Sequence, residues 1–88
     1  MSIKYIFIQL NPNLEISEFH EKKRGFNELS HKLDIYENEE KKQLLLVVID
    51  EEMEKIKTEI KQKIVPKNEY LKMVFGVGLD IVSQFIHK

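Results

Sequence analysis

Residues 43–50, QLLLVVID, contain six consecutive aliphatic side chains, Leu44 to Ile49. An unbroken run of this length is typical of a strand that is buried on both faces. The run passes directly into acidic residues, of which Asp50 can cap a helix and the next two suit its first turn. Apolar residues then recur at helical spacing: Met53, Ile56, Ile60 and Ile64. The segment therefore predicts a buried strand followed by a helix, which Pro66 ends.

A first strand and a first helix are expected upstream of this run. Residues 3–10 are rich in β-branched and aromatic side chains and end at the turn signal Asn-Pro-Asn, residues 11–13, so they predict a strand. Beyond the turn, apolar residues form one helical stripe: Phe19, Phe26, Leu29 and Leu33. We expect a helix of about four turns with Asn13 or Ser17 as N-cap. Gly25 within it costs ~1 kcal/mol relative to alanine.

Two more strands and a last helix complete the pattern. Residues 33–37 alternate apolar and polar side chains and precede a polar loop, which favours a hairpin with the aliphatic run. Alternatively, residues 34–36 form the last turn of the first helix. Residues 71–77 alternate with a period of two and predict a fourth strand, followed by a short helix over residues 79–87. The alternative is a single helix through residues 70–87.

The order of these elements is that of the ferredoxin-like βαββαβ plait, with an added C-terminal helix, in one α+β domain spanning residues 1–88. We expect the first and third strands, which are the most apolar, to form the central pair and to run parallel. Both long helices should then cover one face of the sheet. If the C-terminal segment is wholly helical, the alternative fold is a βαβ unit followed by two C-terminal helices.

The face of the sheet opposite the two long helices is also expected to be apolar, because the third strand is aliphatic on both sides. The first strand presents either Tyr5 and Phe7 or Ile6, Ile8 and Leu10 to that face. Left in water, that face would expose a patch large enough to indicate an interaction site. We expect either the C-terminal helix or a second copy of the protein to cover it. The residues predicted for this interface are Tyr5, Phe7, Leu79, Val82, Phe85 and Ile86.

Composition excludes several classes of function. Fourteen basic and fifteen acidic residues give a formal net charge of -1, which supplies no general attraction to nucleic acid or to an anionic membrane. The chain has no cysteine, which excludes disulfides and thiol catalysis and fits the cytoplasm. No signal peptide and no apolar run of the ~18 residues that span a bilayer are evident. Frequent Lys, Ile, Glu and Asn hint at an AT-rich genome, such as that of a low-GC bacterium or a mobile element.

Few residues suggest chemistry. With parallel central strands, one end of the sheet would gather oxygen ligands that could hold a hard cation: Asn11, Asp50, Glu51 and Glu69. Helix capping and solvation explain the same residues, so no metal and no cofactor are predicted. The histidines are His20, His31 and His87. They show no metal-ligand spacing, and we expect them at the surface.

Residues 6–10, Ile-Phe-Ile-Gln-Leu, resemble the first-strand motif of RNA-recognition domains, which share the plait. Those domains also stack bases on aromatic side chains of the third strand, and the third strand here has none. We therefore expect a regulatory or adaptor protein that acts by association, as a homodimer or with another protein, and the sequence does not favour an enzyme. The alternative is a nucleic-acid-binding or metal-dependent nucleic-acid-processing dimer, with Asn11 and Asp50 near the chemistry.

Overall fold

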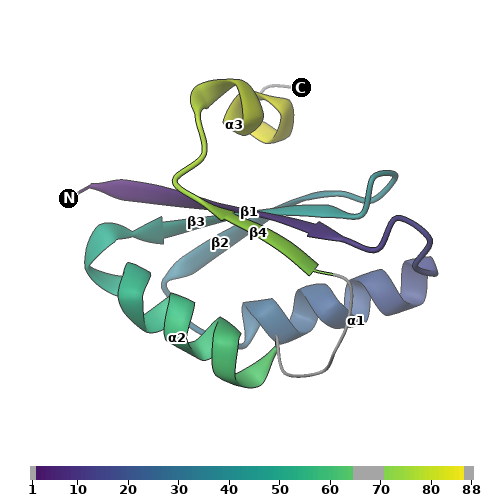
Figure 1. Cartoon of the computed structure of the whole chain (residues 1–88), viewed down its shortest axis with the longest axis horizontal. Helices are drawn as coiled ribbons and strands as arrows, with labels where there is room; N and C mark the ends of the chain where they lie inside the picture. Colours follow the sequence, from purple (N-terminus) through teal and green to yellow (C-terminus); the bar gives the residue numbers. More distant parts are fainter. Residues whose placement is uncertain (1, 65–70, 87–88) are drawn as a thin grey trace.

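The computed structural model describes residues 2–64 and 71–86. Its elements are, in order, β1 (Ile3–Leu10), α1 (Ile16–Asn27), β2 (Leu33–Asn38), β3 (Gln43–Ile49), the 3₁₀ turn η1 (Asp50–Glu52), α2 (Met53–Lys63), β4 (Leu71–Phe75) and α3 (Leu79–Ile86). The described residues thus form an α+β fold with a four-stranded antiparallel sheet and three α-helices. In Figure 1, α1 and α2 lie on one side of the sheet and α3 lies on the other. The alternative of a βαβ unit with two C-terminal helices is wrong, because residues 71–75 pair with β1 as a strand.

The strand order is β2-β3-β1-β4, so the two most apolar strands, β1 and β3, are central and the other two are edges. The expectation that β1 and β3 run parallel is wrong. Ile3 lies opposite Ile49 and Gln9 lies opposite Gln43, an antiparallel register. The connections explain the direction: the crossover through α1 returns the chain so that β2 runs parallel to β1, and the tight turn after β2 then reverses it.

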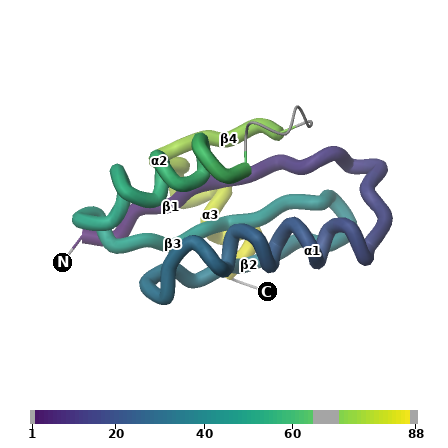
Figure 2. The backbone as a smooth tube through the Cα atoms, turned by 90° about the horizontal axis from the view of Figure 1, so that it is seen from below, coloured from purple at the N-terminus to yellow at the C-terminus, as the bar shows by residue number. Residues whose placement is uncertain are grey.

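The main core lies between the sheet and the two long helices. Its strand residues are Ile6, Ile8, Leu10, Leu33, Leu44, Leu46 and Val48, and its helix residues are Phe19, Phe26, Met53, Ile56 and Ile60. The stripe predicted for α2 is confirmed, since three of its members are buried and Ile64 packs against the core. Figure 2 shows the sheet from below, with α1 alongside β2 and α2 alongside β4. The ammonium group of Lys57 in α2 lies 4.8 Å from the centre of the Phe75 ring in β4.

The boundaries of the two long helices differ from those predicted. α1 ends at Asn27, and Leu33 belongs to β2, where it pairs with Val48 of β3 and is buried in the main core. Neither Asn13 nor Ser17 is the N-cap of α1. That position is Glu15, which makes no side-chain capping bond. Asp50 is likewise no N-cap of α2, because it is the first residue of the 3₁₀ turn that precedes this helix. Pro66, predicted to end α2, lies outside the described residues.

α3 covers part of the opposite face of the sheet through a smaller core, which we call the α3 cluster. Its buried residues are Leu45 of β3 with Val82 and Phe85 of α3, and the partly buried residues around them are Tyr5, Phe7, Val77 and Ile81. The rings of Phe7 and Phe85 meet edge to face, with their centres 6.3 Å apart, an arrangement that stabilises aromatic pairs beyond their burial. Of the two covers considered for this face, the C-terminal helix is therefore present within the chain.

The chain reaches this face through a turn at Gly76. Its φ of +76° is in the left-handed region, which costs an L-residue with a side chain about 1–2 kcal/mol. The amide of Gly76 donates a hydrogen bond of 2.9 Å to the carbonyl of Tyr5, so the turn begins while the chain is still attached to β1. A glycine at this position allows the chain to leave the edge strand and to fold back over the sheet.

We predict opposite effects of the same substitution at two glycines. Gly76→Ala should destabilise the protein by about 1–2 kcal/mol because of its left-handed φ. Gly25→Ala in α1 should stabilise it by about 0.5–1 kcal/mol, because the added methyl group meets nothing within 4 Å and alanine favours the helix. Urea unfolding followed by circular dichroism measures both. A stabilising Gly76→Ala would contradict the described turn.

Candidate functional site

The side of the sheet that carries α3, here called the α3 face, is only partly covered. The strand register places four side chains in one row across it: Tyr36 of β2, Leu45 of β3, Phe7 of β1 and Val74 of β4. Leu45 is fully buried below α3, whereas Tyr36 and Val74, at the two edges, are 39% and 38% exposed. An eight-residue helix is about 12 Å long and about 10 Å wide, and four strands spaced by ~4.8 Å make a wider sheet. The cover is therefore too small for the face.

Exposed apolar side chains concentrate on this side of the protein. Six large hydrophobic residues are exposed among the described residues, and five of them belong to the α3 face or to α3 itself: Ile3, Tyr36, Val74, Leu79 and Ile86. The sixth, Ile16, is the first residue of α1 in the other layer. Leu79 stands out because 80% of its surface is in solvent at the start of α3. Exposed apolar side chains gathered on one side of a protein are typical of interaction sites.

The six residues predicted for the interface divide into two groups. Tyr5, Phe7, Val82 and Phe85 belong to the α3 cluster and contact one another within the chain. Leu79 and Ile86 project into solvent. Two edge residues of the face, Tyr36 and Val74, were not predicted. Their alternation along the strands was visible in the sequence, but which of the two faces they share with Phe7 depends on the register between strands.

The oxygen ligands considered for a cation site are not brought together. Because β1 and β3 are antiparallel, Asn11 follows one end of the sheet, where the amide of Leu10 donates to the carbonyl of Lys42. Asp50 and Glu51 lie at the opposite end, where the amide of Asp50 donates to the carbonyl of Ser2. Glu69 is outside the described residues. The alternative function requires Asn11 and Asp50 to lie near one site, and the fold places them at opposite ends of the sheet.

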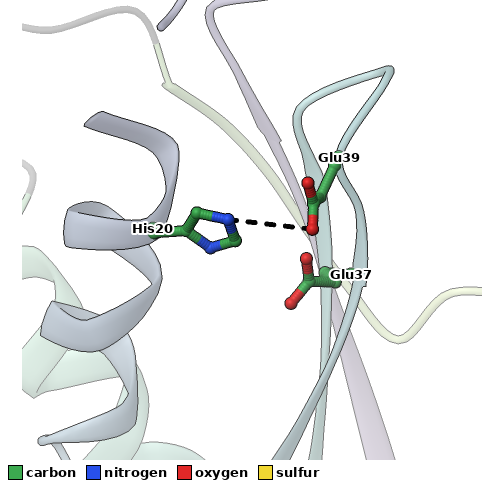
Figure 3. Close-up of side chains that lie close together, drawn as sticks. All are labelled: His20, Glu37 and Glu39. Carbon is green, nitrogen blue, oxygen red and sulfur yellow. Dashed lines mark ion pairs between the residues drawn. The ribbon is translucent and has the colours of Figure 1, made fainter. Parts of the chain in front are cut away.

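A different group of potential ligands is assembled where α1 passes the end of β2 (Figure 3). His20 of α1 faces Glu37 of β2 and Glu39 of the following turn, and one ligand atom from each lies within 4.8 Å of the other two. His20 Nε2 is 3.7 Å from Glu39 Oε1. We call His20, Glu37 and Glu39 the His20 cluster. Lys23, one turn further along α1, donates a hydrogen bond to Glu37. The spacing of the three ligand residues along the chain carries no signal, because only the packing of α1 on the hairpin makes them neighbours.

The charges around Glu37 favour its ionised form. The hydrogen bond from Lys23 is the largest cause that lowers the pKa of Glu37 from its usual 4.5, and partial burial of the carboxylate opposes it. A hydrogen bond with Glu39 and the charges of Lys23 and His20 lower the pKa further. The carboxylate of Glu37 is therefore charged at neutral pH, and it is paired with Lys23.

We predict that this pairing makes stability depend on pH. A carboxyl group whose pKa is lowered by folding stabilises the protein above its unfolded value, near 4.5, and this contribution disappears as the pH falls through the lowered value. Glu37→Gln should therefore lower the free energy of unfolding by about 0.5–1 kcal/mol at pH 7. In acid, the variant and wild type should be equally stable. Urea unfolding between pH 7 and pH 3, with a chelator present, measures the difference. In a protein that already carries Lys23→Met, Glu37→Gln should lower the free energy of unfolding much less than it does in wild type. Equal losses in the two backgrounds would contradict the pairing.

Comparisons of the chain with family models, with curated proteins and with solved structures found no match. Within residues 2–64 and 71–86, none of the helices has the length and apolar character needed to cross a bilayer. The candidate sites described above are the partly covered α3 face and the His20 cluster.

Proposed function

We propose that the protein acts by association, forming a homodimer through the α3 face and serving as a regulatory or adaptor module. The observation that carries this proposal is that five of the six exposed large hydrophobic residues lie on the side of the sheet that carries α3. Water is a poor environment for such a surface, since apolar area removed from it contributes about 25 cal/mol per Å². A second copy of the chain offers the same apolar surface as a cover.

We also propose that the fold is the ferredoxin-like plait. Three observations support this assignment: the βαββαβ order of the elements up to β4, the central position of β1 and β3, and the two long helices on one face (Figure 1). α3 is an addition to that plan. A fold of this kind serves many unrelated functions, so the assignment supports the architecture and the proposed dimer depends on the surface itself.

The α3 face is compatible with a dimer of two-fold symmetry. In an isologous dimer the same patch meets itself, so apolar residues of one protomer cover those of its partner. Leu79 projects from the start of α3, and Val74 lies on the neighbouring edge strand. Three exposed charges accompany them on this side: Asp34 on β2, Lys72 on β4 and Asp80 on α3. Because both signs are present, Lys72 of one protomer can pair with a carboxylate of its partner.

We predict that wild type sediments at micromolar concentration with about twice its monomer mass of 10.5 kDa. Leu79→Glu should weaken the dimer by about ten- to a hundredfold, because a leucine side chain contributes ~1.5–3 kcal/mol when buried. Glutamate is well tolerated in the first turn of a helix, so the fold of the monomer should survive. Sedimentation equilibrium over a range of concentrations gives the dissociation constants.

Ile16→Glu is the matched control for this experiment. Ile16 is the first residue of α1, as Leu79 is of α3, and it is 46% exposed on the layer remote from the α3 face. This variant should dimerise as wild type does. Phe85 is unsuitable as a test position, because it is buried in the α3 cluster and a charge there would disrupt the monomer. A wild type that stays monomeric, or equal losses in both variants, would refute the proposed dimer.

A further inference from the structure

The His20 cluster contains the types of ligand that transition metals bind, and its ligand atoms lie within 4.8 Å of one another. Two carboxylates and one imidazole converge from α1, β2 and the turn that follows β2 (Figure 3). Imidazole is the ligand that distinguishes this cluster from an ordinary acidic patch, because it favours Zn²⁺ and similar ions over Mg²⁺ and Ca²⁺, which prefer oxygen. Zinc accepts three protein ligands of these types and completes a tetrahedron with water.

The separation of the donors is close to that of a zinc site. Bonds of ~2.0–2.2 Å at a tetrahedral angle place two ligand atoms about 3.4 Å apart. His20 Nε2 and Glu39 Oε1 are already 3.7 Å apart, and the group as a whole lies within 4.8 Å. The side chains of His20 and Glu39 are 47% and 48% exposed, so small rotations about their bonds can close the remaining gap.

The backbone that carries the ligands is held in place by separate contacts. The His20 ring packs edge to face on the fully buried Phe19, with ring centres 5.7 Å apart. In the turn, the carbonyl of Glu39 accepts a bond of 2.9 Å from the ammonium group of Lys42. The side chain of Asn38 accepts a bond from the amide of Lys41. A site whose supports are fixed loses less entropy when the ion binds.

We propose that His20, Glu37 and Glu39 bind one Zn²⁺ ion per chain. The ion links α1 to the hairpin of β2 and β3, two parts of the chain that otherwise meet here through ion pairs. Lys23 competes with it, since its ammonium group hydrogen-bonds to Glu37 and neutralises one of the two carboxylates. Zinc binding therefore releases Lys23 from Glu37, and it stabilises the fold in proportion to the occupancy of the site.

Calorimetric titration of the metal-free protein with ZnCl₂ at pH 7.5 tests the proposal. We expect one ion per chain with micromolar affinity, and a rise in melting temperature when zinc is in excess. His20→Gln and Glu39→Gln should each weaken binding at least tenfold, and MgCl₂ should give neither heat nor a shift in melting temperature. Lys23→Met should bind zinc more tightly than wild type, a result that a loss of folding could not produce.

Two control variants distinguish binding at the His20 cluster from zinc binding elsewhere on the surface. His31→Gln removes an exposed histidine outside the cluster and should leave zinc affinity unchanged. Leu79→Glu changes the α3 face, on the other side of the sheet, and should also leave it unchanged, so failure of the dimer and failure of the zinc site are distinguishable. The proposal is overturned by the absence of heat with zinc at millimolar concentration. It is also overturned if His20→Gln binds as wild type does, or if His31→Gln loses as much affinity as His20→Gln.

Discussion

The burial of β3 on both of its faces is the constraint on which the architecture depends. Leu44, Leu45 and Leu46 point alternately to the two sides of the sheet, and all three are completely buried. A buried leucine side chain contributes roughly 1.5–3 kcal/mol, which is a large part of the marginal stability of so small a protein. The sheet must therefore be covered on both sides. α1 and α2 provide one cover, and α3 provides the other.

The two covers are unequal, and the inequality is the basis of the proposed function. The long helices bury the strand residues on their side in one continuous core. The chain reaches the other side only after β4, through the left-handed turn at Gly76, and the helix that follows has eight residues. It protects the central strands and leaves Tyr36 and Val74 exposed at the edges. An apolar surface remains because the chain supplies too little helix to cover it.

The polar groups of interest lie on the other layer, where α1 passes the hairpin. Glu37 alternates with Tyr36 along β2, so it points toward α1 when Tyr36 points toward α3. This alternation separates the two proposals in space: association uses one side of the edge strand, and cation binding uses the other. Because of this separation, a variant can change the α3 face without changing the His20 cluster, and the reverse also holds.

Local patterns in the sequence were sufficient to predict the class of most elements, the central place of β3 and the buried side of α2, because periodicity and hydrophobicity can be read within one segment. Tertiary contacts were needed for the rest. The direction of β3 follows from a crossover combined with a tight turn. Because β3 runs antiparallel to β1, Asn11 and Asp50 lie at opposite ends of the sheet. Leu33 fits the stripe of a helix, but its pairing with β3 placed it in β2. His20 lies close to Glu37 because α1 packs on the hairpin. Such contacts between distant segments depend on register and packing, which no local pattern of side chains encodes.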